Sequence, residues 1–151
     1  MDNVIKQKIE FEISQIEEHI AHSSVLIQKC RLQAPDYVEL CATGSIIHSY
    51  YNGIENILLL IAKNIDDVTP NSGKWHSELL FSMCAENENR TAVFSEALKI
   101  PLTEYMNFRH FFRHSYGYSM KWEKFSHLFL GLEDNWMKVK TELNGFLSKN
   151  S

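Results

Sequence analysis

The fold is decided by the stretch IKQKIEFEISQIEEHIAHSSVLI, residues 5–27. Its isoleucines, at positions 5, 9, 13, 16, 20 and 27, recur at steps of three, four or seven residues. This spacing places them on one stripe of an α-helix. The pattern predicts a first helix from about Asn3 to Gln33, capped by Asp2 or Asn3. The sequence Ala34-Pro35-Asp36 ends it, because the residue before a proline disfavours helical backbone.

A second helix is predicted from about Asp36 to Asn64, and the clearest loop of the chain, Thr69–Gly73, follows it. Two glycines inside this helix, Gly44 and Gly53, indicate close approach of a neighbouring helix, at some cost in helix propensity. The predicted inner face consists of Tyr37, Leu40, Ile47, Tyr51, Ile54, Leu58 and Ile61.

The rest of the chain predicts further helical segments, with a polar turn at Glu86–Arg90. These segments are Lys74–Cys84, Thr91–Leu98, a motif-bearing helix that starts at Pro101 and ends near Gly117, and Lys121–Leu147. Six glycines and three prolines in 151 residues leave few interruptions. We therefore predict an all-α fold, an antiparallel bundle of four to five helices that forms one domain over residues 1–151.

Composition and charge narrow the class of protein. Hydrophobic residues make up 44% and charged residues 23%, as in globular domains rather than disordered chains. The net charge of −4 argues against a general nucleic-acid coat protein. Bases nevertheless outnumber acids between Lys99 and Lys124, so this region is able to attract phosphates.

Cysteine usage and hydropathy predict a cytoplasmic protein. The three cysteines form no CxxC pattern, which disfavours a disulfide framework or a zinc ribbon, and Cys41 and Cys84 are expected to be small core residues. The N-terminus has no basic segment followed by an apolar run, so no signal peptide is expected. The longest apolar run, Ile57–Ala62, is too short to span a bilayer.

The segment RHFFRHSY, residues 109–116, combines two arginines, two histidines and a tyrosine. At about 100° per residue, the nearby phenylalanines fall on one face of the helix and the basic residues on another arc. We predict that Phe108, Phe111 and Phe112 are buried. The arginines and histidines are predicted to form a cationic, titratable strip on the outside.

These residue types suit metal-independent RNA cleavage. In that reaction the ribose 2′-hydroxyl loses a proton and attacks the phosphorus, and the 5′-oxygen leaves with a proton. Arg109 would offset the charge of the transition state. His114 would be general base or acid, together with His110 or with a second His114 across a dimer. The predicted RNA-binding side chains are Arg113, Tyr116 and Lys121.

Other candidate sites are weak. His19 and His22 lie three residues apart but have no third ligand at a suitable spacing, and there is no glycine-rich phosphate loop, so neither a metal nor a cofactor is predicted. We expect His48, His76 and His127 to be structural and hydrogen-bonded. Of these, His76 is expected to lie near the RNA-binding cleft. Glu55 lies mid-helix among apolar residues. It is expected to be structural, either paired with a buried base or reaching solvent.

The pattern R-x4-H-x-Y, formed by Arg109, His114 and Tyr116, resembles the signature of the HEPN superfamily. These are small all-helical ribonucleases common in bacterial and archaeal toxin–antitoxin pairs. His110 fits the polar position that often follows the arginine. Residues 50–58 are similar to the second helix of HepT-type toxins, and residues 75–80 to their short third helix.

The resemblance implies a helical bundle that dimerises, with two copies of the motif facing each other across a two-fold axis to form one RNA cleft. It also implies a partner, a minimal nucleotidyltransferase antitoxin of the MNT type. Such an antitoxin transfers AMP from ATP to the tyrosine of the motif, here Tyr116. Phosphate and adenosine beside Arg109 would then block the cleft.

The sequence leaves three functions for this protein to be compared. The first is a toxin endoribonuclease that cleaves tRNA or mRNA. The alternative is a non-catalytic helical module that binds a nucleotide or substrate and accompanies a nucleotidyltransferase, although a pure scaffold does not need His114. The third is a plain helical dimerisation protein, in which Arg109 and His114 have no chemical role.

Overall fold

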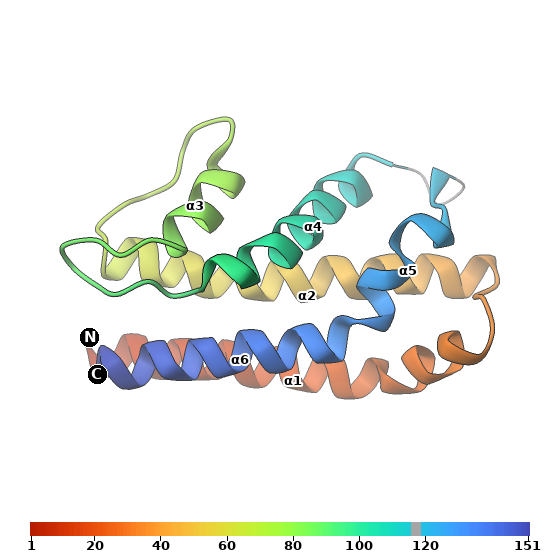
Figure 1. Cartoon of the computed structure of the whole chain (residues 1–151), viewed down its shortest axis with the longest axis horizontal. Coiled ribbons are helices and arrows are strands. Elements are labelled where there is room, and N and C mark those ends of the chain that lie inside the picture. The colour runs from red at the N-terminus through yellow and green to blue at the C-terminus, as the bar shows by residue number, and fades with distance from the viewer. Residues whose placement is uncertain (116–118) are drawn as a thin grey trace.

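The computed structural model of the protein describes residues 1–115 and 119–151. Its named elements are six α-helices, which confirms the prediction of an all-α helical bundle (Figure 1). They are α1 (Asn3–Leu32), α2 (Tyr37–Asn64), α3 (Trp75–Met83), α4 (Glu96–Arg113), α5 (Trp122–Leu130) and α6 (Leu132–Lys149). Over the part of the chain that the structure describes, no helix combines the length and the apolar character needed to cross a membrane.

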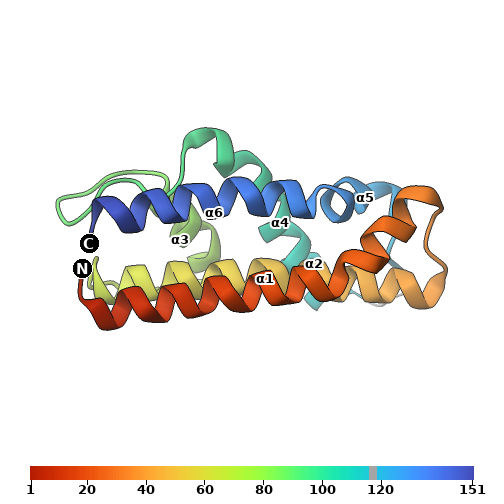
Figure 2. The ribbon, with the colours of Figure 1, turned by 90° about the horizontal axis from the view of Figure 1, so that it is seen from below.

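Three long helices form the frame of the bundle. Helix α1 runs antiparallel to α2 and α6, while α4 crosses α2 obliquely and α3 lies beside it (Figures 1 and 2). The two ends of the frame meet, because the Met1 ammonium group donates a hydrogen bond to the Asn150 carbonyl at 2.9 Å. The motif helix α4 lies on the side of α2 that faces away from α1 and α6 (Figure 1).

Local signals explain the α1–α2 hairpin. The Asp2 side chain accepts a hydrogen bond from the Val4 amide at the start of α1. At the start of α2, Asp36 and Glu39 form a reciprocal capping box. Gly53 permits the close packing that its position predicts, because an added Cβ would lie 2.7 Å from Cγ1 of Ile16.

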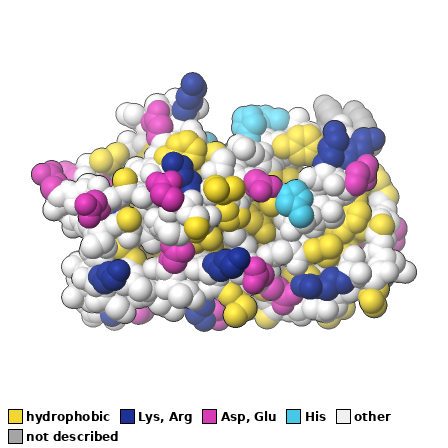
Figure 3. Space-filling model, in the orientation of Figure 1, with side chains coloured by type: hydrophobic (Ala, Val, Ile, Leu, Met, Phe, Trp, Pro, Cys, Tyr) yellow, Lys and Arg dark blue, Asp and Glu magenta, His cyan; other side chains and the backbone are white. Residues whose placement is uncertain are grey.

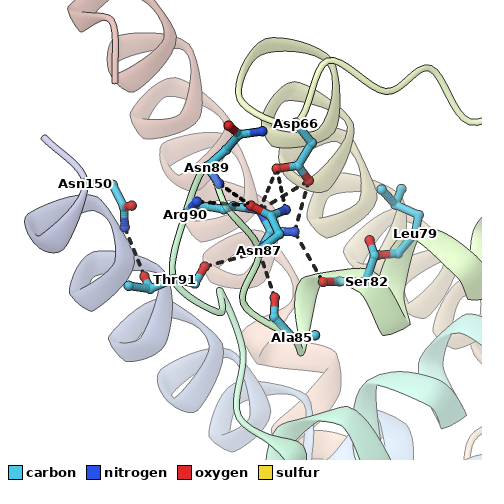
Figure 4. A network of polar contacts seen from close by, with 9 residues as sticks. All are labelled: Asp66, Leu79, Ser82, Ala85, Asn87, Asn89, Arg90, Thr91 and Asn150. Carbon is cyan, nitrogen blue, oxygen red and sulfur yellow. Dashed lines mark hydrogen bonds and ion pairs between the residues drawn. The ribbon is translucent and has the colours of Figure 1, made fainter.

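A buried arginine fixes the segment between α3 and α4 (Figure 4). The Arg90 side chain is 1% exposed, and its Nε donates to Oδ1 of Asp66 at 2.9 Å. Its Nη1 donates to the Ala85 carbonyl at 3.0 Å, and its Nη2 donates to the Ser82 carbonyl at 3.2 Å. This arginine therefore ties the start of the connector to the end of α2, which sets where α4 begins.

The predicted start of the motif helix at Pro101 is wrong. Helix α4 begins at Glu96, Ser95 caps it by accepting from the Leu98 amide, and Pro101 lies inside it. The separate helix predicted over Thr91–Leu98 is also wrong, since helical structure begins only at Glu96. A proline at this position removes one backbone donor. The cap and the apolar face that continues through Leu98 outweigh that loss.

The predicted single helix over Lys121–Leu147 is likewise wrong, because Gly131 divides it into α5 and α6. The Gly131 amide donates to the His127 carbonyl at 2.9 Å, and its own carbonyl accepts from Asn135 at 2.9 Å. A Cβ at Gly131 would lie 2.8 Å from the His127 carbonyl oxygen. The glycine thus permits a change of direction that a side chain would obstruct (Figure 1).

Two buried tyrosines hold α4 and α6 against the rest of the bundle. The Tyr105 hydroxyl, on α4, donates to the Leu128 carbonyl of α5 at 2.6 Å. The Tyr50 hydroxyl, on α2, donates to Oδ1 of Asn135 on α6 at 2.6 Å. Satisfied buried hydrogen bonds of this kind favour one arrangement of the helices, because breaking either leaves a buried polar group unpaired.

Candidate functional site

The motif occupies the C-terminal end of α4. His114 is the C-cap residue, and its amide donates to the Phe111 carbonyl at 3.1 Å. The side chains of His110, Arg113 and His114 are exposed. Figure 3 shows histidine side chains gathered on the upper surface over α4. Tyr116, the predicted site of modification and RNA contact, lies outside the described residues.

Arg109 does not belong to the outer strip that the helical wheel predicts. Its side chain is only 12% exposed and faces α2, where Nη2 lies 3.8 Å from Oε1 of Glu55 and 3.5 Å from Oδ1 of Asn52. The buried residues Leu102 and Tyr105 precede it by seven and four positions, which places Arg109 on their face. The positions of the three phenylalanines, taken alone, therefore predict the wrong buried face for this helix.

Glu55 links three helices around the arginine. Its side chain, on α2, is 3% exposed, and Oε2 accepts a hydrogen bond from Nδ1 of His76 on α3 at 2.8 Å. The His76 ring stacks on Trp75, with ring centroids 3.6 Å apart. Of the two alternatives for Glu55, the structure therefore shows the buried one, paired with basic groups. A buried carboxylate between two such groups restricts where the Arg109 guanidinium can lie.

His110 and His114 form an adjacent pair of imidazoles on the surface. Their ring centroids are 4.6 Å apart and the rings are tilted by 54°. They lie one helical turn apart, on the same side of α4. Two exposed imidazoles this close are able to give and take protons at one bound group, which is what acid–base catalysis requires.

His48 lies beneath the motif on α2, and its ring centroid is 5.3 Å from that of Phe112. Burial lowers the pKa of His48, and the charges of Arg109 and Arg113 lower it further, against an opposing effect of Glu55. Its Nε2 is buried with no hydrogen-bond partner among the described residues, so the prediction of a satisfied structural histidine is wrong here. A neutral His48 avoids a third positive charge beside the two arginines.

Two other polar atoms around this point lack partners within the described ranges, namely the Tyr51 hydroxyl and Nε of Arg109. Burial raises the pKa of Tyr51 well above its ordinary value, and the carboxylate of Glu55 adds to this effect. Tyr51 thus stays a neutral hydroxyl beside the arginine. The α2–α4 contact therefore combines a neutral histidine, a neutral tyrosine and one ion pair.

The three phenylalanines are not equally buried. Phe108 is 6% exposed and belongs to the core. Phe112 is half-buried, and a Cβ at Gly44 would lie 2.9 Å from its ring, so the prediction of close helix approach holds at this glycine too. Phe111 is 41% exposed, so the prediction that it is buried is wrong. It faces α5 at the edge of a groove, where the bundle leaves its ring half in solvent.

Lys121 lies in a different cavity from Arg109. It lines a groove of about 350 Å³ between α4 and α5, together with Phe111 and Lys124. Arg109 and His110 instead line a cavity of about 220 Å³ between α3 and α4. The structure thus places Arg109 and His110 in one cavity and His114 beside His110, and it separates Lys121 from this cavity.

The remaining histidines have structural partners. The His19 ring contacts the Ile46 carbonyl at 3.1 Å, and the exposed His127 contacts Oε2 of Glu104 at 2.6 Å. Within residues 1–115 and 119–151, no group of three or more His, Cys, Asp or Glu side chains is arranged to hold a metal ion. Cys84 is buried and Cys41 half-buried. Burial raises the pKa of the Cys84 thiol, in keeping with a core role.

The sequence alone does not identify the group of polar residues on α2 that surrounds Arg109, although a buried base is one of the two partners expected for Glu55. His48, Asn52 and Glu55 recur at steps of four and three residues, so they share one face of α2. Three polar residues on a helix face that also carries the buried Tyr51 are a signal for a buried polar site. That signal identifies the face of α2, but not the helix that packs against it.

Comparison with known proteins agrees with the geometry. The chain matches the family model described as HepT-like protein over residues 42–150, which include α3 to α6 and most of α2. No curated protein and no solved structure matches it in the corresponding comparisons. Because the matched region is well over half of the chain, the protein belongs to the HepT-like family.

Proposed function

We propose that the protein is the toxin of a toxin–antitoxin pair and acts as a metal-independent endoribonuclease on tRNA or mRNA. Membership of the HepT-like family supports a ribonuclease role of this kind. The proposed catalytic residues are Arg109, His110 and His114. No cofactor takes part in the proposed reaction.

One observation carries the proposal. Arg109 is paired with Glu55 at 3.8 Å and shares the α3–α4 cavity with His110, whose ring centroid is 4.6 Å from that of the exposed His114. A fixed guanidinium beside a pair of titratable rings is the minimum that phosphodiester transfer needs without a metal. An ordinary surface ion pair has no need of the buried carboxylate or of the second imidazole.

In the proposed reaction, the guanidinium of Arg109 binds the non-bridging oxygens of the phosphate and offsets their extra charge in the transition state. One histidine removes the proton of the ribose 2′-hydroxyl, whose oxygen then bonds to phosphorus. A second histidine protonates the departing 5′-oxygen. The products are a 2′,3′-cyclic phosphate and a free 5′-hydroxyl. His110 and His114 of one chain supply the two groups, or two copies of His114 do so across a dimer.

Regulation is proposed to act at the same place. A nucleotidyltransferase antitoxin of the MNT type would transfer AMP to Tyr116, two positions after His114 in the sequence. The added phosphate would compete with RNA for the arginines and the adenosine would fill the cleft. Two copies of the chain are proposed to pair so that their α4 ends face each other.

The test is cleavage of total tRNA and a model mRNA in EDTA by wild type, His114→Ala and His22→Ala. His22 is an exposed histidine on α1, far along the sequence from the motif, so it serves as the matched control. We expect His114→Ala to lose at least about 100-fold in rate, the usual contribution of a general acid or base. His22→Ala should cut like wild type.

Equal cutting by His114→Ala and wild type would contradict the proposal. No cutting by any protein, with intact mass showing an unmodified chain, would favour the non-catalytic binding module instead. A binding module held by Arg109 would keep its affinity for nucleotide in His114→Ala. Binding and cleavage are therefore measured on the same preparations.

A further inference from the structure

The cavity between α3 and α4 is unusual in its charge. It has a volume of about 220 Å³ and its lining includes Lys74, His76, Asn107, Arg109 and His110. No carboxylate side chain belongs to this lining, whereas acidic side chains line the four other cavities described in the chain. A cavity with two cations and two imidazoles, in a chain of net charge −4, favours an anionic ligand.

The cavity is continuous with the proposed catalytic residues, because Arg109 and His110 belong to both. His110 lines the cavity, and its ring lies 4.6 Å from that of His114 on the other side. The Arg109 side chain also lines the cavity, although only 12% of it is exposed. An RNA strand whose reacting phosphate lies at His114 would therefore have its next phosphate close to this cavity.

The inner wall of the cavity is fixed in advance. His76 donates through Nδ1 to the buried Glu55 and stacks on Trp75 at 3.6 Å. Arg109 is anchored to the same carboxylate. Rigid walls of this kind lower the cost of ordering a site when a ligand binds.

We propose that the α3–α4 cavity is a subsite for a second phosphate of the RNA strand, adjacent to the phosphate that reacts. This inference rests on the proposed ribonuclease function and adds a binding position to it. The volume is below the range of about 300–1,000 Å³ typical of whole-ligand pockets, which fits one phosphate or sugar-phosphate unit. Lys74, whose side chain is exposed, supplies a positive charge, and the Asn107 amide supplies a neutral donor.

Lys74 offers the cleanest test. Its side chain is exposed and takes part in none of the ion pairs found among the described residues, so Lys74→Ala should leave the fold intact. Lys63, exposed on α2 and absent from the cavity, is the matched control. Both substitutions are made in the wild type and in the His114→Ala background, which separates binding of RNA from its cleavage.

The experiment measures the affinity of a fluorescent single-stranded RNA for each His114→Ala protein over a range of salt concentrations. We expect Lys74→Ala to weaken binding several-fold and to reduce the slope of log K against log salt by about 0.7, the value for one lost phosphate contact to a single strand. In the cleaving protein, the same substitution should raise KM by a similar factor and leave kcat unchanged, because the subsite lies away from the reacting atoms. Lys63→Ala should change neither quantity.

An unchanged affinity and salt slope in the Lys74→Ala protein would overturn the subsite. If wild type still cleaves RNA, the proposed function survives that result. If wild type binds RNA with the predicted Lys74 dependence but never cleaves it, the cavity is a phosphate site and the ribonuclease proposal is wrong. A loss of kcat instead of a rise in KM would also count against a separate binding position.

Discussion

Glu55 is the residue on which the arrangement of the site depends. It is almost completely buried, it accepts a hydrogen bond from His76, and it lies within ion-pair distance of Arg109. A buried charge is tolerated when paired and hydrogen-bonded, and removing one partner leaves the other uncompensated. The carboxylate therefore serves both the stability of the α2–α3–α4 contact and the position of the guanidinium.

We expect Glu55→Gln to lower the free energy of unfolding by about 3 kcal/mol, because it leaves Arg109 without its buried counter-charge. Urea denaturation measures this, with the exposed Glu18→Gln as control, for which little change is expected. In an Arg109→Met background the same substitution should cost much less, since the charge that Glu55 offsets is gone. An equal cost in both backgrounds would mean that the two side chains do not interact.

The pKa of His48 predicts a pH dependence of stability. Burial and the charges of Arg109 and Arg113, opposed by Glu55, lower this pKa in the folded state below the ordinary value of about 6.5. As the pH falls below about 6.5, the unfolded chain takes up the proton first, so the free energy of unfolding decreases. The contribution of His48 to the free energy of unfolding is complete above that pH. It decreases as the pH falls, until His48 is also protonated in the folded state.

His48→Phe removes this titration while keeping an aromatic ring against Phe112. We expect urea denaturation at pH 7, 6 and 5 to show a smaller loss of stability for this variant than for the wild type. His22→Ala, which removes an exposed histidine, should keep the wild-type pH dependence. A His48→Phe protein that loses as much stability on acidification as the wild type would contradict the assignment.

At the scale of elements, Gly131 decides how the last two helices are arranged. We expect Gly131→Ala to destabilise the fold by about 1–2 kcal/mol, because its Cβ would lie 2.8 Å from the His127 carbonyl oxygen. Gly145, on the exposed side of α6 with nothing near its Cβ position, is the matched control. Gly145→Ala should stabilise by about 0.5–1 kcal/mol through helix propensity. Thermal unfolding distinguishes the two, and opposite signs are the expected result.

The sequence predicts α1 and α2 to within one or two residues because their signals are local. Isoleucine spacing, the Asp36 capping box and the proline between the helices lie within the segments themselves. The predictions made from Pro101 and Gly131 are wrong because they too rest on local signals alone. A proline usually starts a helix and a lone glycine usually does not end one. In this chain the packing of Leu98 and the contact of Gly131 with His127 decide the outcome.

The site is predictable in its chemistry and not in its geometry. The residues of the motif can be named from their types and spacing, but Arg109 and Asn52 are 57 positions apart. The spacing from Leu102 and Tyr105 places Arg109 on the buried face of α4, but no periodicity shows that α2 is the helix that covers it. The cavity next to Lys74 depends in the same way on where α3 lies against α4.

At the scale of the whole molecule, the exposed histidines of the motif lie apart from the apolar core. That core takes buried side chains from all six helices, and the candidate site lies on the outer side of α2, where α3 and α4 cover it (Figures 1 and 2). The exposed side chains of His110 and His114 can therefore be altered with little loss of core packing.

Cleavage of RNA by attack of its own 2′-hydroxyl is tested by offering the protein an RNA strand and a DNA strand of the same mixed sequence in EDTA. We expect the wild-type protein to cut the RNA to fragments ending in a 2′,3′-cyclic phosphate and to leave the DNA intact, because deoxyribose lacks the nucleophile. Cutting of both strands, or cutting of RNA only after a divalent cation is added, would contradict it.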